Sequence, residues 1–157
     1  MSGDASEHVE RYLRQTFRLD SIGLQRVGLF LLAHVLIDTH LIAHALFNTI
    51  LTSERRTEDG LRLTDIEEIA DEMAQGTFGK HLDRVKAGLP GDTGEIAGAI
   101  NEARNALLHW RRDRFSLPVY KGQDVTTEPG FRACMEDVLR FIQTVPFDRT
   151  IAGDLQA

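Results

Sequence analysis

One short segment of this sequence places together the side chains that could do chemistry. Arg104 is followed directly by Asn105, and His109 comes four residues after that. A guanidinium is planar and permanently charged, so it can bind phosphate oxygens and stabilise charge that grows during transfer. A neutral imidazole can remove a proton from a ribose 2′-hydroxyl near physiological pH. The trio therefore suits cleavage of a phosphodiester, with Asn105 orienting the imidazole or the phosphate.

The segment 104–109 is expected to be helical, and helix geometry separates its two key groups. At about 100° per residue, Asn105 and His109 share a face, while Arg104 lies about 140° from His109 around the axis. One straight helix therefore does not aim Arg104 and His109 at one small point. Two copies packed about a two-fold axis could do so, because each would contribute both side chains to a common cleft.

Further charged residues could support this site. Three arginines follow His109 and would give a basic, RNA-facing rim: Arg111, Arg112 and Arg114. Asp38 lies in an apolar segment, where an acid needs a partner, and Arg104 is a candidate. Glu102 could orient Arg104, although a solvated position on the helix surface is the commoner outcome for such a residue.

Other histidines fit structural roles better than a metal site. His40 and His44 are four residues apart and could present two nitrogens to one metal ion. A third ligand is missing, since His34 lies about 15 Å along the axis from His44. We therefore expect no metal and no cofactor. A purely structural role also remains open for Arg104, Asn105 and His109, as a polar patch near a helix end.

Length and composition are those of a single globular domain. The chain has 157 residues, of which 42% are hydrophobic and 27% charged, and its net charge is −6. We expect one domain over 1–157, with a core over about 5–145 and a loosely held tail over 146–157. The single cysteine, Cys134, cannot form an intramolecular disulfide, which favours the cytoplasm. The hydrophobic segment 27–51 includes Asp38 and several polar residues, so we expect a core helix and no membrane association.

Apolar periodicity predicts an all-α bundle of about five or six helices with a long central helix. Helices are expected over 6–17, 21–53, 64–76, 77–89, 92–110 and 131–145. A capping box formed by Thr64 and Glu67 would start the third, and the span 113–129 is expected to be irregular. The second helix is apolar around most of its girth, which is typical of a central or dimer-seam helix.

Arg104, Asn105 and His109, on the penultimate helix of an all-α chain, resemble the signature of the HEPN superfamily (higher eukaryotes and prokaryotes nucleotide-binding domains). That signature is Arg and His separated by four to six residues, often with Asn directly after the Arg, and four residues separate Arg104 from His109 here. The resemblance implies a dimeric helical bundle. It also implies a metal-independent endoribonuclease that leaves 2′,3′-cyclic phosphate and 5′-hydroxyl ends, as in toxins and antiviral defence proteins. Arg104 would bind the scissile phosphate, His109 would be the general base, and Asn105 would orient.

One position departs from part of this family. Toxins paired with nucleotidyltransferase antitoxins often carry Tyr two residues after the His, where this sequence has Arg111. Two hypotheses therefore stay open. The first is an RNA-cleaving homodimer, with an antitoxin or another protein as partner. The second is a non-catalytic dimeric module of the same fold that binds a protein, a nucleotide or RNA, which the acidic net charge favours.

Overall fold

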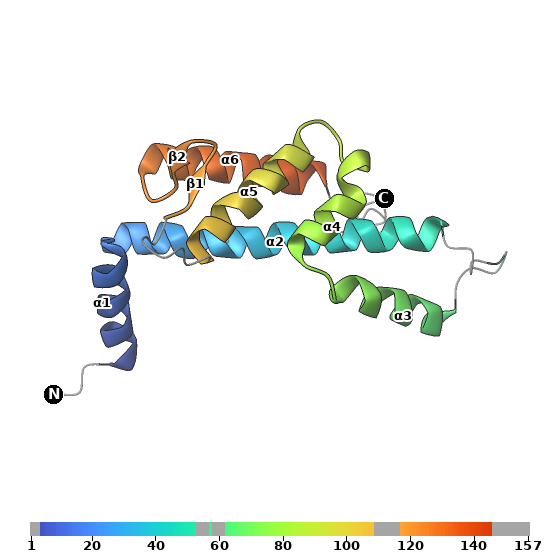
Figure 1. Ribbon diagram of the computed structural model, residues 1–157, viewed down its shortest axis with the longest axis horizontal. Coiled ribbons are helices and arrows are strands. Elements are labelled where there is room, and N and C mark those ends of the chain that lie inside the picture. The colour runs from blue at the N-terminus through green and yellow to red at the C-terminus, as the bar shows by residue number, and fades with distance from the viewer. Residues whose placement is uncertain (1–3, 53–56, 58–61, 109–116, 146–157) are drawn as a thin grey trace, which may run out of the picture. The chain divides into compact units, whose positions relative to one another are not determined.

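The computed structural model describes residues 4–52, 57, 62–108 and 117–145. In these ranges the chain is helical apart from one small hairpin (Figure 1). The elements are α1 (Ala5–Phe17), α2 (Ser21–Thr52), α3 (Leu63–Ala74), α4 (Phe78–Val85), the 3-10 helix η1 (Lys86–Gly88), α5 (Thr93–Leu108), β1 (Val119–Tyr120), β2 (Gln123–Asp124) and α6 (Glu128–Thr144). The expected all-α helical fold class and the long second helix are confirmed.

The chain groups into two compact units. The first contains Met1–His34 and Ala99–Asp137, and the second contains Val35–Gly98 and Val138–Ala157. Three helices, α2, α5 and α6, contribute residues to both units. The candidate site residues on α5 belong to the first unit, which is therefore the unit that must position them.

Aromatic and aliphatic side chains from α2, α5, the hairpin and α6 form the core of the first unit. Its buried hydrophobic residues are Val27, Phe30, Ala33, Ile100, Ala103, Tyr120, Val125 and Cys134. Arg26 of α2 ties the helices to the hairpin region, because its Nη1 donates to the backbone oxygen of Thr126 at 2.7 Å. Its guanidinium also lies over the ring of Phe131. These two contacts join α2 to the segment after the hairpin and to the start of α6.

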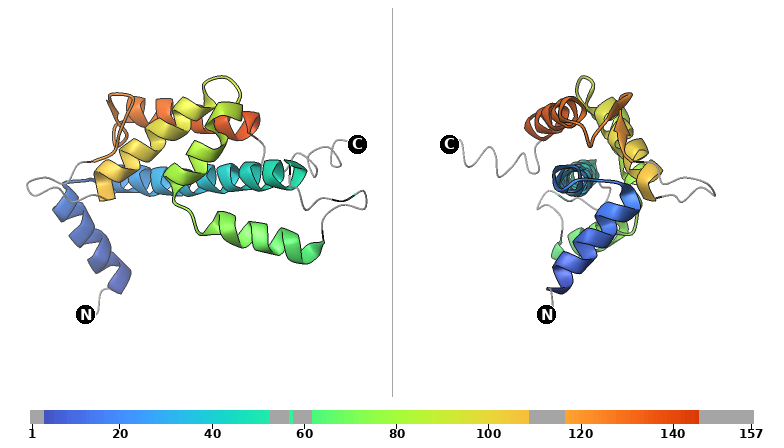
Figure 2. Two further views of the ribbon diagram at one scale, coloured as in Figure 1. Left: turned by 45° about the vertical axis from the view of Figure 1, so that its right-hand side comes forward. Right: turned by 90° about the vertical axis from the view of Figure 1, so that its left-hand side faces the viewer.

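The strands β1 and β2 were not expected, because the span 113–129 lacks an alternating pattern of useful length. They pair antiparallel through a two-residue turn in which Lys121 and Gly122 both have positive φ, at 46° and 80°. Such turns match the right-handed twist of a hairpin, and glycine adopts this conformation without steric strain. The buried Tyr120 donates its hydroxyl to Oδ2 of Asp137 on α6 at 2.7 Å, and Figure 2 shows the hairpin beside α6.

Helix α1 begins one residue before the predicted start and ends where predicted, at Phe17, but none of its residues is buried. Asp4 caps its N-terminus by accepting a hydrogen bond from the backbone N–H of Ser6. Arg18 ends it in the left-handed conformation. Val9 is exposed although it lies at helical spacing from Leu13 and Phe17. In Figures 1 and 2, α1 turns away from the N-terminal end of α2. Leu13 and Phe17, nearer the C-terminal end of the helix, are half-buried.

The second unit packs the remainder of α2 with α3 and α4, the start of α5 and the end of α6. Its buried hydrophobic residues include Ile37, Leu41, Ile69, Phe78, Leu82, Ile96 and Phe141.

The capping box predicted for Thr64 and Glu67 is wrong. Helix α3 begins at Leu63, Arg62 is its N-cap residue without a side-chain cap, and Arg62 Nε instead donates to Asp65 at 3.1 Å. At α4, Thr77 does cap the helix by accepting from the N–H of Lys80.

One helix in the described ranges meets the length and hydropathy criteria for crossing a membrane. It is the stretch Ser21–Thr49 of α2, with mean hydropathy 1.7, and 44% of the window is buried. The core helix of a soluble protein passes the same test. Polar atoms within this stretch have protein partners, since His40 Nδ1 donates to the backbone oxygen of Val145 at 2.6 Å and Asp38 is bonded to His81. These buried polar contacts favour the interpretation of α2 as a core helix.

Candidate functional site

Helix α5 starts at a sharp turn. Gly91 has a positive φ of 57°, and the hydroxyl of the buried Thr93 donates to the backbone oxygen of Pro90 at 2.6 Å. Glu95 lies in the first turn, where a negative charge is favourable to the helix dipole. The helix then runs without interruption to Leu108. It thereby carries Arg104 and Asn105 in its last turns.

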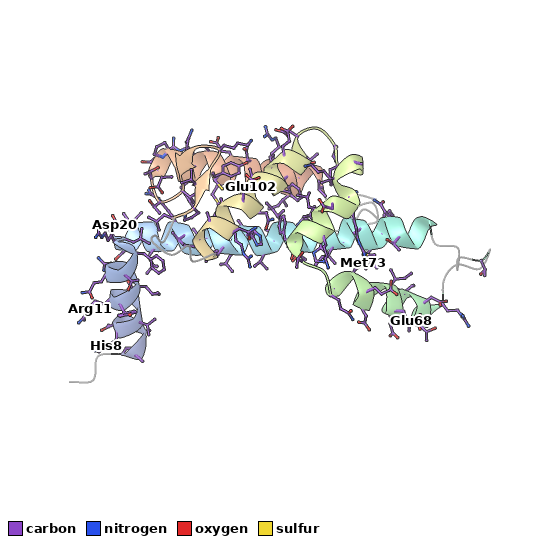
Figure 3. All side chains as sticks on the ribbon, in the orientation of Figure 1. His8, Arg11, Asp20, Glu68, Met73 and Glu102 are labelled. Carbon is purple, nitrogen blue, oxygen red and sulfur yellow. The ribbon has the colours of Figure 1, made fainter. Side chains whose placement is uncertain are left out.

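The buried face of α5 sets the orientation of the site residues. Ile96, Ile100 and Ala103 are fully or almost fully buried, at the spacing of one helix face. Arg104 and Asn105 lie beside this face and are half-buried, whereas Glu102 is exposed. Figure 3 shows Glu102 on α5. Arg104 and Asn105 are therefore positioned by the packing of the helix rather than by a loop.

The side chains of Arg104 and Asn105 contact each other. Arg104 Nη1 donates to Oδ1 of Asn105 at 3.1 Å. In the described part of the chain, Arg104 forms no ion pair with a carboxylate, Glu102 included. A half-buried guanidinium without a carboxylate partner retains its capacity to bind an anion such as phosphate.

A second polar contact lies one helical turn earlier. Nε2 of His34 on α2 is 3.3 Å from Oδ1 of Asn101 on α5, and both residues belong to the first unit. His34 is buried and Asn101 is half-buried. Residues three and four positions apart are neighbours on a helix surface, so Asn101 adjoins both Arg104 and Asn105. The sequence analysis missed Asn101 and did not connect His34 with the site. Asn101 could have been found, because it precedes Arg104 by three residues and Asn105 by four, which is the spacing of neighbours on a helix.

Several of the predicted site residues lie outside the described residues. These are His109 and the arginines expected to form a basic rim, Arg111, Arg112 and Arg114. Their predicted roles stay predictions.

Asp38 has a partner that the sequence did not suggest. Its Oδ1 is 2.8 Å from Nδ1 of His81, and Nε2 of the same ring is 2.8 Å from the backbone oxygen of Met73, which Figure 3 labels on α3. The proposed partner was Arg104, whereas the hydrogen bond observed for Asp38 is within the second unit. His81 is buried, so this polar contact has a structural role in the packing of α2, α3 and α4.

Comparisons of the chain with models of known protein families, with curated proteins and with solved structures find no match. The interpretation of the site accordingly depends on the residues of this chain and on their geometry.

Proposed function

We propose that this chain is a metal-independent endoribonuclease of HEPN type that works as a homodimer. Arg104 binds the scissile phosphate, His109 removes the proton from the ribose 2′-hydroxyl, and Asn105 orients the reacting groups. The products are a 2′,3′-cyclic phosphate and a 5′-hydroxyl. Arg111, Arg112 and Arg114 bind the RNA backbone beside the site. The proposal includes a cytoplasmic location and a role as a toxin or defence protein, with an antitoxin or other protein partner.

The observation that carries the proposal is the environment of the Arg104 guanidinium, that is, its burial and its hydrogen-bond partner. Its guanidinium is half-buried on a packed helix and contacts a neutral amide, Asn105 Oδ1, at 3.1 Å. An arginine that only stabilised the fold would more often be paired with a carboxylate at this depth. A guanidinium held beside an amide instead supports binding of a phosphate, because the phosphate then supplies the missing negative charge.

A homodimer is part of the proposal because Arg104 and His109 point about 140° apart if the helix continues through His109. The surface of α2 supports self-association. Ile22, Leu29 and Leu36 are seven residues apart and exposed, and Leu32 and Val35 extend the same stripe. Arg26, the one Lys, Arg, Asp or Glu between Ile22 and Leu36, is half-buried and donates to the backbone oxygen of Thr126. An exposed apolar stripe with heptad spacing is typical of a helix that packs against another helix.

The experiment is an RNA cleavage assay with purified protein in the presence of EDTA. Wild-type protein should cut total RNA, and the fragments should carry 2′,3′-cyclic phosphate ends. Arg104→Ala and His109→Ala should each remove the activity without changing the thermal unfolding. The matched control is Arg132→Ala, because Arg132 is an exposed arginine on α6 that pairs with Glu128. Cleavage that survives both site substitutions would exclude this mechanism.

A second candidate function is a non-catalytic dimer that binds RNA, a nucleotide or a protein. The net charge of −6 favours it, since most proteins that cover RNA are locally and globally basic. The same assay separates the two candidates. RNA binding that depends on Arg104, with no cleavage under any condition in which the protein is folded, supports the binding module.

A further inference from the structure

Two amide side chains on α5 have their oxygen atoms engaged in the same way. Oδ1 of Asn105 accepts from Arg104 Nη1 at 3.1 Å, and Oδ1 of Asn101 lies 3.3 Å from His34 Nε2. An amide oxygen can only accept, so Nε2 of His34 carries a hydrogen and donates it. These hydrogen bonds favour an orientation of each amide in which the oxygen faces its donor and the NH2 group faces away from it.

The amino ends of these two amides are then the groups left to bind a ligand. In the described ranges, no protein acceptor takes a hydrogen bond from the side-chain NH2 of Asn101 or of Asn105. Asn101 and Asn105 are one turn apart on the same side of α5, and Arg104 is adjacent to both. Together they form a surface made of hydrogen-bond donors, which is the chemistry that a phosphate oxygen requires.

We propose that Asn101 is a phosphate-binding residue of this site and that His34 is its positioning residue. Asn101 donates from its NH2 group to a phosphate oxygen of the RNA backbone, beside the oxygen bound by Arg104. His34, buried on α2, holds the amide oxygen so that the NH2 group faces the ligand. This inference rests on the proposed function, because it extends the Arg104 site from one helical turn to two.

His34 is suited to this role because it is itself buried and follows buried residues of α2. Phe30 precedes it by one turn and is completely buried, and Ala33 beside it is buried as well. A buried side chain loses little further conformational freedom when the ligand binds. Holding Asn101 in its orientation therefore adds little to the entropy lost on binding. An unanchored asparagine would have to be ordered by the RNA itself.

The test is binding of a single-stranded RNA in which every ribose is 2′-O-methylated, since this probe cannot be cleaved through the 2′-oxygen. Binding is followed by fluorescence anisotropy. Asn101→Asp replaces the NH2 donor with an oxygen of nearly equal size and should weaken binding at least tenfold. Asn101→Ala should weaken it less. The matched control is Gln143→Glu on the exposed face of α6, which makes the same change of charge and should leave binding unchanged.

The role of His34 is tested by a double-mutant cycle with Asn101. His34→Ala should weaken binding several-fold in the wild-type background and should have no further effect in the Asn101→Ala background. His34→Gln keeps a donor and should restore most of the affinity. A merely structural role of His34 would give the same loss in both backgrounds, and that result would overturn the positioning role.

A measurement on the wild-type protein keeps the proposal testable if a variant fails to fold. On titration with the same RNA, the side-chain NH2 resonances of Asn101 should shift together with the Nε–H resonance of Arg104. If Arg104→Ala abolishes binding while Asn101→Asp binds normally, or if the Asn101 resonances do not move, the inference is wrong and the proposed function is untouched. If Arg104→Ala binds normally, the proposed function itself fails.

Discussion

Nδ1 of His81 on α4 lies 2.8 Å from Oδ1 of Asp38 on α2, and the ring is almost completely buried. Its other nitrogen, Nε2, is 2.8 Å from the backbone oxygen of Met73 on α3. A backbone oxygen only accepts, so Nε2 carries a hydrogen. One imidazole therefore joins three helices of the second unit through its two nitrogens. An acid inside an apolar helix is satisfied by this contact and needs no role in catalysis.

The first prediction concerns this contact. His81→Ala removes both hydrogen bonds of the buried ring, so the free energy of unfolding should fall by about 2 kcal/mol. The amide of Asp38→Asn can still donate to or accept from Nδ1 of His81, so its loss should be smaller, about 1 kcal/mol. The measurement is urea unfolding at neutral pH. The control is Asp71→Asn, an exposed acid on α3, which should change stability by less than about 0.5 kcal/mol. Equal effects of Asp38→Asn and Asp71→Asn would contradict the importance of this hydrogen bond.

The second prediction uses two glycines on either side of the start of α4. A Cβ atom on Gly76 would lie 2.6 Å from Nε2 of His81, whereas a Cβ on Gly79 would meet nothing within 4 Å. Gly76→Ala should therefore destabilise the protein by about 1–3 kcal/mol, because the buried ring cannot move without losing its partners. Gly79 is inside the helix, so Gly79→Ala should stabilise it by about 0.5–1 kcal/mol. Thermal unfolding of the two variants should show shifts of opposite sign, and shifts of the same sign would be inconsistent with the packing around His81.

The third prediction is a pH dependence from Cys134. Burial raises the pKa of the thiol from 9.0 to about 12, and the Asp137 carboxylate adds to the rise. Below pH 9.0 the thiol is protonated in the folded and unfolded chain, so its protonation does not favour unfolding. As the pH rises from there toward 12, only the unfolded chain loses the proton, and this contribution to stability is lost.

This loss should appear in the free energy of unfolding. The difference in that free energy between wild type and Cys134→Ala should become smaller as the pH rises. The variant creates a small cavity and should be less stable at pH 8. Between pH 8 and pH 10 the free energy of unfolding of the wild type should fall by about 1 kcal/mol more than that of the variant. Urea unfolding at both pH values measures the difference. A difference in the free energy of unfolding that stays constant or grows would show that the thiol ionises equally well in the folded state.

The fourth prediction concerns self-association through α2. Leu29→Lys combined with Leu32→Lys places two charges in the exposed apolar stripe and should convert the proposed dimer into a monomer, as measured by light scattering after chromatography. Leu63→Lys on α3 is the control, because Leu63 is equally exposed but outside the stripe, and this variant should stay dimeric. A wild-type protein that is monomeric at all accessible concentrations would remove the shared site from the mechanism.

The fold class and the buried face of α5 could be predicted from the sequence because apolar spacing alone determines them. Ile96, Ile100 and Ala103 recur at helical intervals with small or polar residues between them, and all three are buried. On α6 the pattern misled. Leu139 is 54% exposed although it follows the buried Val138, while Phe141 is completely buried. Apolar residues occur on nearly every side of that helix, so only tertiary packing decides which side turns inward.

In the site, too, features within one helix could be predicted from the sequence, whereas contacts between residues far apart in the sequence could not. Arg104 and Asn105 could be selected from residue type and spacing within one helix. The contact between His34 and Asn101 joins residues 67 positions apart, and no periodicity in the sequence encodes that pairing. The partner of Asp38 was also missed, because an acid in an apolar helix shows that a partner is needed without showing which one. Cys134 is completely buried on α6, as a packing residue is.

The most direct test of the proposed enzyme is complementation between two inactive variants. In a two-fold dimer that pairs Arg104 of one copy with His109 of the other, a heterodimer of Arg104→Ala and His109→Ala keeps one intact site. Each variant alone should not cleave RNA, and an equal mixture after subunit exchange should regain about a quarter of the wild-type rate. A mixture that stays inactive, although mass spectrometry shows that heterodimers have formed, would contradict a site shared between two copies.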